Sequence, residues 1–197
     1  MIERMENTLK DSNELSRRAL IQSAAFVPLA ALTLSAQPAE AVKTVLTPSQ
    51  MKTLEAFIDR LIPRDELGPG AVDAGAQFYI DRVLAGPDAA EKNTFIQGLE
   101  AIDASAKMVH GAPLAELAAD KRDQVLTANA TTPFFNRARR LTLEGMFGDP
   151  YYGGNKGFAG WDLIRYPGPR PGTDPDMQRM DKAPAPYRRS AWGPQYK

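Results

Sequence analysis

The chain has 197 residues, 43% of them apolar, and its 24 basic and 24 acidic side chains cancel. This balance gives no bulk field for nucleic acid or an anionic surface. The absence of cysteine excludes disulfides, cysteine-ligated iron–sulfur clusters and haem attachment through a Cys-x-x-Cys-His motif. The single histidine, His110, leaves little for a metal site or for histidine acid–base chemistry.

Residues 1–41 have the pattern of an export signal. Arg17 and Arg18 precede an apolar, alanine-rich run from residue 19 to 36, and Ala-Glu-Ala at 39–41 offers a cleavage site ending at Ala41. Polar residues and a proline interrupt the run, which makes it a poor permanent membrane span. The paired arginines favour the twin-arginine route, which carries folded proteins. We therefore expect export to the periplasm; the alternative is an amphipathic helix with a chance arginine pair.

Residues 42–164 carry apolar side chains at helical spacing in about five segments. The first opens at Thr47-Pro48, where Gln50 can complete a capping box, and stops before Pro63. Further helices are expected over 72–83, 95–109 and 120–126, and from Thr132-Pro133 to Leu141. No stretch alternates apolar and polar residues convincingly, so the predicted fold is all-α, a small bundle of about five helices.

The helical region offers no convincing catalytic group. Asp65 and Glu66 are adjacent and point apart on most backbones, and Asp81 with Arg82 is interpreted as a solvated helix face. No glycine-rich loop follows a strand in the manner of a dinucleotide-binding fingerprint. A basic cluster on the fifth helix could hold a phosphate, although a stripe of surface ion pairs is the favoured interpretation. This cluster comprises Arg137, Arg139 and Arg140.

A glycine-rich, aromatic stretch runs from Gly145 to Trp161. Asp149-Pro150 and the Gly-Gly-Asn at 153–155 are strong turn signals. A long loop without regular structure is usually functional, and aromatic side chains carry enough apolar area to fix it to a surface. That surface could belong to the chain's own helices or to another protein.

Residues 165–197 predict an extended, proline-rich, basic arm. Seven of the 16 prolines fall there, and seven basic residues against three acidic ones give a charge of +4. The preceding residues 42–164 have 13 basic and 16 acidic residues, or −3. Unlike a typical disordered tail, the arm is rich in aromatic residues, such as Tyr166, Tyr187 and Trp192. It could wrap a partner or fold back over its own bundle.

Several motifs in order resemble the gluconate 2-dehydrogenase subunit 3 family, over roughly residues 44–170. The early group is Leu46-Thr47-Pro48, Thr53-Leu54, Asp59-Arg60-Leu61-Ile62-Pro63, Gly68-Pro69-Gly70-Ala71, Ala74-Gly75 and Tyr79-Ile80-Asp81. The later and more telling group is Gly145-Met146-Phe147, Asp149-Pro150, Tyr152-Gly153-Gly154-Asn155, Gly160-Trp161 and Tyr166-Pro167-Gly168. Beyond Pro171 nothing matches.

The resemblance implies a non-catalytic small subunit of a membrane-associated dehydrogenase that binds no cofactor itself. The large subunit would be an FAD-containing oxidoreductase of the glucose–methanol–choline type, acting on gluconate, fructose, glucose or a related polyol. A multihaem cytochrome c subunit would pass electrons to quinone. The small subunit would supply the export signal and aid maturation of the large one, so that the complex lies on the periplasmic side of the inner membrane. A stand-alone periplasmic enzyme or binding module is the alternative.

The family assigns no catalytic, cofactor-binding or metal-binding positions to this chain, so none is expected. The candidate residues are of two kinds: the arginine pair of the export signal, and side chains that could contact a partner. The candidate partner interface comprises Asp149, Tyr151, Tyr152, Asn155 and Trp161, with Arg137 and Arg140 on the fifth helix.

Overall fold

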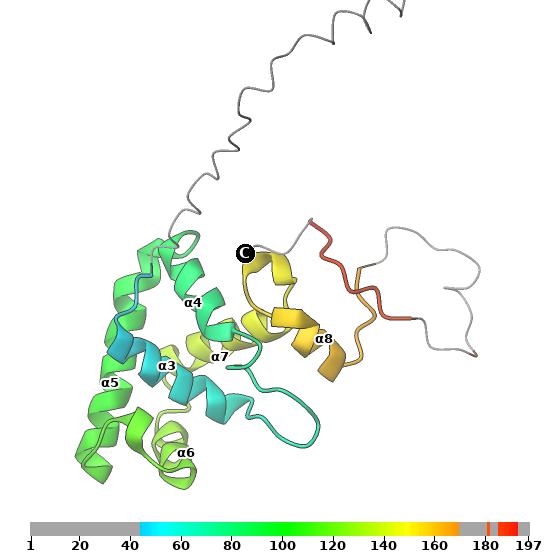
Figure 1. The fold of residues 1–197 in the computed structure, drawn as a ribbon. Coiled ribbons are helices and arrows are strands. Elements are labelled where there is room, and N and C mark those ends of the chain that lie inside the picture. The colour runs from blue at the N-terminus through cyan, green and yellow to red at the C-terminus, as the bar shows by residue number, and fades with distance from the viewer. Residues whose placement is uncertain (1–43, 170–180, 182–184, 193–197) are drawn as a thin grey trace, which may run out of the picture. The chain divides into compact units, whose positions relative to one another are not determined.

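The structure is a computed structural model, and it describes residues 44–169, 181 and 185–192 (Figure 1). The predicted export signal, with Arg17 and Arg18, lies outside the described residues, as does much of the predicted arm. Six α-helices occur in the described part: α3 (Pro48–Leu61), α4 (Ala76–Ala85), α5 (Lys92–His110), α6 (Ala119–Ala128), α7 (Pro133–Phe147) and α8 (Ala159–Leu163). Short 3-10 helices are η2 (Ala89–Glu91), η3 (Leu114–Glu116), η4 (Pro150–Tyr152) and η5 (Lys156–Phe158).

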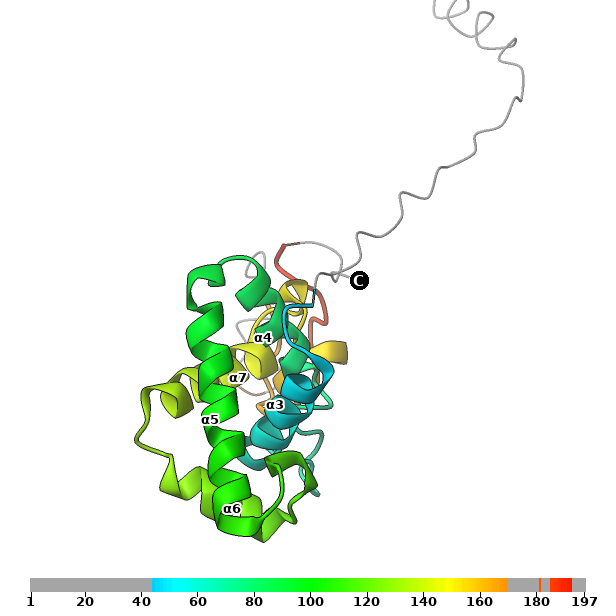
Figure 2. The ribbon, with the colours of Figure 1, turned by 90° about the vertical axis from the view of Figure 1, so that its left-hand side faces the viewer.

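The predicted all-α class is confirmed. Within the described ranges there is no β-strand, only an isolated bridge between Asp65 and Gly68. None of the helices in these ranges combines the length and the apolar character needed to cross a membrane. In Figure 1, α5 and α8 lie on opposite sides of the bundle, and in Figure 2 the view is turned so that α5 faces the reader.

Helix α3 begins as the sequence predicts. The Thr47 hydroxyl accepts a hydrogen bond from the Gln50 amide at 3.3 Å, and the Gln50 side chain accepts one from the Thr47 amide at 3.0 Å. This reciprocal capping satisfies two donors that the helix itself cannot. The helix ends at Leu61, before Pro63, as expected from the missing amide of proline.

An aromatic cluster joins three helices at the centre of the core. Phe57 of α3 is fully buried, and its ring lies edge-on to Phe134 at 5.7 Å and to Phe135 at 5.3 Å, both on α7. The Phe134 ring also contacts Phe95 of α5 at 5.2 Å. A Cβ on Gly98 would lie 2.1 Å from the Phe134 ring, so glycine at this position lets α5 and α7 approach.

Two predicted boundaries are wrong. The second helix begins at Ala76 rather than near Val72, because residues 71–75 form turns that end at Gly75, with φ of 76°. Helix α7 continues to Phe147 and includes Gly145, which the sequence assigned to the loop. A Cβ on Gly145 would lie 3.0 Å from the Ala76 Cα, so this glycine serves the close crossing of α4 and α7 rather than a turn.

The interpretation of Asp81 as a solvated residue is also wrong. Its side chain is buried on α4, and one carboxylate oxygen accepts hydrogen bonds from the amides of Val45 at 3.0 Å and Leu46 at 2.9 Å. These two bonds fix the segment that leads into α3 against α4. Asp81 is therefore a structural anchor, since a buried carboxylate is tolerated only when its oxygens are hydrogen-bonded.

Replacing Asp81 by alanine should lower the free energy of unfolding by about 2–3 kcal/mol, because two buried amides lose a charged acceptor. Denaturant unfolding followed by circular dichroism would measure the loss. The matched control is Asp123→Ala, which removes an exposed carboxylate paired with Arg60 at 2.8 Å. That change should cost less than about 1 kcal/mol. Equal losses in the two variants would contradict the anchoring role.

Candidate partner interface

Asn155 fixes the glycine–aromatic loop to the end of α7. Its side chain is fully buried; the amide nitrogen donates to the Gly148 carbonyl at 2.9 Å, and the amide oxygen accepts from the Gly160 amide at 2.8 Å. Its backbone amide donates to the Gly145 carbonyl at 2.7 Å. Asn155 adopts φ of 46°, a left-handed conformation that asparagine tolerates better than most residues. A single side chain therefore joins the two ends of the loop.

The loop backbone crosses α7 at van der Waals distance. A Cβ on Gly154 would lie 2.1 Å from the Gly145 carbonyl oxygen, and one on Gly160 would lie 1.9 Å from the Met146 carbonyl oxygen. Any other residue would force these backbones apart. Lys156 adds a bond from its amide to the Ala74 carbonyl at 2.8 Å, so the loop also contacts the turn before α4. The loop is thus docked on its own helices and contains η4, η5 and α8 rather than irregular chain.

Trp161 lies on the inner side of α8. It is 5% exposed, its indole nitrogen donates to the Phe147 carbonyl at 2.9 Å, and its ring contacts Phe158 at 5.3 Å and Tyr166 at 5.0 Å. Neither Trp161 nor Asn155 reaches the surface in this structure. Asn155 and Trp161, both predicted as partner contacts, therefore hold the chain's own loop and offer no surface to a partner in this structure.

Asp149 connects the loop to the C-terminal arm. One carboxylate oxygen accepts from the Tyr151 amide at 2.9 Å, and the other accepts from the Ala191 amide at 2.9 Å. Tyr151 in turn places its ring edge-on to that of Tyr152, with centroids 5.3 Å apart. For residues 185–192, the open question about the arm is answered: this segment lies against the chain's own loop.

Three of the seven candidate residues line one groove. Tyr152, which is 47% exposed, contributes from η4, while Arg137 and Arg140 contribute from α7. The groove has a volume of about 460 Å³. Its other lining residues come from α4, η2, the turn between them and the end of α7. They are Tyr79, Arg82, Val83, Pro87, Asp88, Glu91 and Glu144.

The charges in this groove are paired within the chain. Arg137 forms ion pairs with Asp88 and with Glu91, the latter at 2.7 Å, and Arg140 pairs with Glu144 at 3.6 Å. Burial works against the charge of Arg137, but the hydrogen bonds and charges of its two partners outweigh it and raise the pKa of the guanidinium. The ion-pairing interpretation of the basic cluster is confirmed for Arg137 and Arg140. The groove therefore presents a nearly neutral, hydrogen-bonding wall rather than an anion site.

Sequence reasoning missed the acidic half of this groove. Asp88 and Glu91 lie 46 to 49 positions before Arg137, so no local pattern pairs them. The Arg140–Glu144 pair, by contrast, has the i, i+4 spacing of a helix surface pair and could have been found. Tyr79 packs its ring against the core, and its hydroxyl donates to Glu144 at 3.0 Å.

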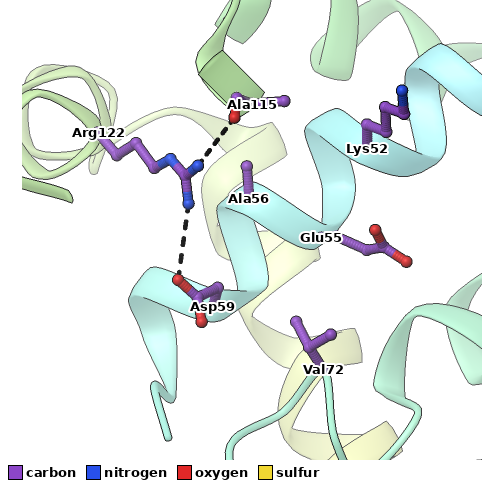
Figure 3. Close-up of a pocket in the computed structure, with 7 residues that line it drawn as sticks. All are labelled: Lys52, Glu55, Ala56, Asp59, Val72, Ala115 and Arg122. Carbon is purple, nitrogen blue, oxygen red and sulfur yellow. Dashed lines mark hydrogen bonds and ion pairs between the residues drawn. The ribbon is translucent and has the colours of Figure 1, made fainter. Parts of the chain in front are cut away.

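A second hollow, of about 310 Å³, lies between α3, η3 and α6 (Figure 3). Arg122 closes one side: it donates to the carbonyls of Leu114 at 3.2 Å and Ala115 at 2.8 Å, and its charge lies 3.7 Å from Asp59. In Figure 3, Glu55 points away from this pair. The guanidinium of Arg122 donates its hydrogen bonds to backbone carbonyls of the same chain and lies near Asp59, so it joins α6 to α3. None of the candidate interface residues lines this hollow.

The fold and its sites define a small all-helical protein with a docked glycine–aromatic loop and an internally neutralised groove. The described residues include no group of three or more histidine, aspartate or glutamate side chains placed to hold a metal ion. The chain belongs to the family described as gluconate 2-dehydrogenase subunit 3, whose sequence model matches residues 48–168. This range spans α3 to the segment after α8. No curated protein and no solved structure matches the chain.

The close crossing of the loop and α7 predicts unequal effects of alanine at two glycines. Gly160→Ala should destabilise the protein by about 3 kcal/mol or more, because the new methyl group overlaps a backbone carbonyl that cannot move alone. Gly157 is the matched control: it has φ of 64°, but a Cβ there meets nothing within 4 Å. Gly157→Ala should cost only about 1–2 kcal/mol of left-handed strain. Thermal unfolding of both variants measures the difference, and similar losses would refute the crossing.

Tyr79 should ionise at a higher pH than an ordinary tyrosine, because its pKa is raised. Burial, followed by the hydrogen bond and charge of Glu144, raises the pKa of Tyr79 to about 12. Since an ordinary tyrosine has a pKa of about 10, folding favours the neutral phenol. This contribution to stability is fully present below pH about 10 and is lost as the pH rises through about 12.

Tyrosinate absorbance during alkaline titration would measure this step, which Tyr79→Phe should remove. From pH 10 to 12 the wild type should also lose more stability than Tyr79→Phe, because only the wild type has the shifted group. Tyr166→Phe, which removes a partly exposed tyrosine outside the groove, should leave the late step intact. A late step that persists in Tyr79→Phe would contradict the assignment.

Proposed function

We propose that this chain is the non-catalytic small subunit of a membrane-associated, FAD-dependent sugar or sugar-acid dehydrogenase complex of the gluconate 2-dehydrogenase type. The observation that carries the proposal is the family match over residues 48–168. In this proposal FAD belongs to the large subunit of the glucose–methanol–choline type, and haem c to a cytochrome subunit that delivers electrons to quinone. The chain itself contributes binding surface, not reactive groups.

The geometry of the described residues is consistent with a binding role. The groove beside Tyr152 holds carboxylates and arginines in mutual ion pairs, which leaves no carboxylate in those pairs free to act as a general base. The loop that carries the family's most telling motifs uses its buried polar side chain, Asn155, to bind its own backbone. The side chains of Tyr152 and Arg140 remain at the surface of the groove, so we retain these two residues as candidate partner contacts there.

The proposal includes export by the leader. Arg17 and Arg18, followed by the apolar run to residue 36, have the pattern of a twin-arginine signal. A large subunit that folds around FAD before export needs a route that accepts folded cargo. We propose that this chain supplies that signal for itself and for the flavoprotein, aids the flavoprotein's maturation, and reaches the periplasmic face of the inner membrane in complex with it.

The test is capture of an affinity-tagged full-length chain from its native host, with bound FAD and haem c measured per mole of chain. We expect both cofactors to co-purify with the chain from the periplasmic and membrane fractions. In Arg17→Lys/Arg18→Lys, both this chain and the flavin should stay in the cytoplasm. The control Arg4→Lys changes an arginine of the same leader outside the pair and should not affect export.

Two results would contradict the proposal. A chain that is recovered alone and oxidises or hydrolyses a substrate without help would favour a stand-alone periplasmic enzyme. A chain recovered alone that binds a small ligand without turnover would favour a binding module. If the lysine variant still reaches the periplasm together with its flavoprotein, the export part of the proposal is wrong while the subunit assignment stands.

A further inference from the structure

The C-terminal arm adds a second surface to the loop. The Tyr187 amide donates to the Pro167 carbonyl at 2.6 Å, and a Cβ on Gly168 would lie 2.0 Å from the Tyr187 carbonyl oxygen. Arg188 pairs with Asp162 of α8 at 2.7 Å. Together with the bond from Ala191 to Asp149, these contacts hold residues 185–192 beside residues 162–169, as Figure 1 shows for the red and orange segments.

This arrangement leaves large apolar side chains in solvent. Trp192 is 66% exposed, and Ile164, Tyr166 and Tyr187 are also exposed. The polar contacts that fix the arm to the loop use the backbone amides of Tyr187 and Ala191 and the side chain of Arg188, not the aromatic rings of Tyr187 and Trp192. An exposed cluster of large apolar residues on a folded protein marks an interaction site.

Two exposed guanidinium groups on this surface have no carboxylate partner among the described residues. Arg189 has only a 3.5 Å contact with the Tyr187 hydroxyl, and Arg165 has no side-chain bond or ion pair to a described residue. Arg188, by contrast, is neutralised by Asp162. We name the exposed residues of these two adjacent segments the arm face: Ile164, Arg165, Tyr166, Tyr187, Arg189 and Trp192. The arm face carries two positive charges that have no carboxylate partner among the described residues.

Arg165 is held in an unfavourable backbone conformation. Its φ is 55°, in the left-handed region where a residue with a Cβ is strained and where glycine would fit without cost. Arg165 follows the C-cap of α8: its amide donates to the Asp162 carbonyl at 3.1 Å and the Tyr166 amide donates to the Trp161 carbonyl at 2.7 Å, so this left-handed residue ends the helix. The conformation of Arg165 therefore belongs to the end of α8, and what Arg165 offers a partner is its exposed guanidinium group, which has no ion-pair partner among the described residues.

We propose that the arm face is the principal docking surface for the large flavoprotein subunit, and that it binds an acidic patch there. This inference rests on the proposed function. Tryptophan, tyrosine and arginine are the residues that most often dominate protein–protein binding energy, and the arm face contains all three in exposed positions. The two unpaired guanidinium groups require carboxylates on the partner, since a charge desolvated without a partner costs binding energy.

The test compares FAD captured per mole of tagged full-length chain, co-expressed with the large subunit, across matched variants. Tyr187→Ala/Trp192→Ala should weaken capture about thirtyfold or more, as expected for truncated anchor residues. The control Met108→Ala/Val109→Ala truncates two exposed apolar residues at the far end of α5 and should capture as much FAD as the wild type. Circular dichroism and the emission of the buried Trp161 would report that the variants are folded.

A second variant separates docking from folding. Arg165→Gly removes the guanidinium group but suits φ of 55°, so the isolated chain should melt at a higher temperature while FAD capture falls. If Arg165 had only a structural role, the melting temperature and the FAD capture of Arg165→Gly would rise together or fall together. If Arg165→Gly and the double variant capture FAD like the wild type, the arm face is not the docking surface, although the proposed function stands.

Two other outcomes would overturn the inference. If the wild type binds vesicles of phosphatidylglycerol and the double variant loses that binding with FAD capture unchanged, the face contacts lipid rather than the flavoprotein. If the wild-type chain captures no FAD at all, the proposed function fails first and this inference fails with it.

Discussion

The buried side chain of Asn155 fixes the loop that follows α7. Its amide group bonds backbone atoms on both sides of the loop, at Gly148 and at Gly160, while glycines at 154 and 160 let that backbone lie directly on the carbonyls of α7. The loop backbone cannot shift to accept a larger side chain at these glycines, because it already touches the backbone of α7 and interiors are close-packed. The positions of Tyr152 and Asp149 follow from this docking.

The fold distributes its charges unequally between two surfaces. In the groove, Arg137 pairs with Asp88 and Glu91, and Arg140 pairs with Glu144, so the groove is neutral at short range. On the arm, α8 supplies Asp162 as an ion-pair partner for Arg188, and the neighbouring arginines remain unpaired among the described residues. Of the basic residues that the structure describes in the arm, Arg165 and Arg189 are exposed and lie within two residues of the exposed Tyr166 and Tyr187. Charge and apolar area coincide on the arm face and not in the groove.

The helices could be predicted because their signals are local. Thr47 and Gln50 cap α3, Thr132 caps α7, and Gly111 ends α5 with φ of 77°, each within a few residues of the boundary concerned. The failures occurred where a distant contact decided the outcome. Gly145 looks like a turn residue in the sequence, yet it lies within α7 because α4 packs against it. Polar side chains were the hardest to place, since a carboxylate such as Asp81 looks the same in the sequence whether it binds water or buried amides.

The sequence by itself determined the helical class, the capping of the helices and the family, because periodicity, caps and ordered motifs are properties of short segments. Tertiary structure alone decided which candidate residues face outward. Asn155 and Trp161 became interior supports, Tyr152 and Arg140 stayed at the groove, and the arm returned to its own loop through the carboxylate of Asp149. The physical reason is that the burial and hydrogen bonding of a side chain depend on backbone that is far away in the sequence. A short sequence pattern contains no information about which distant segment will pack there.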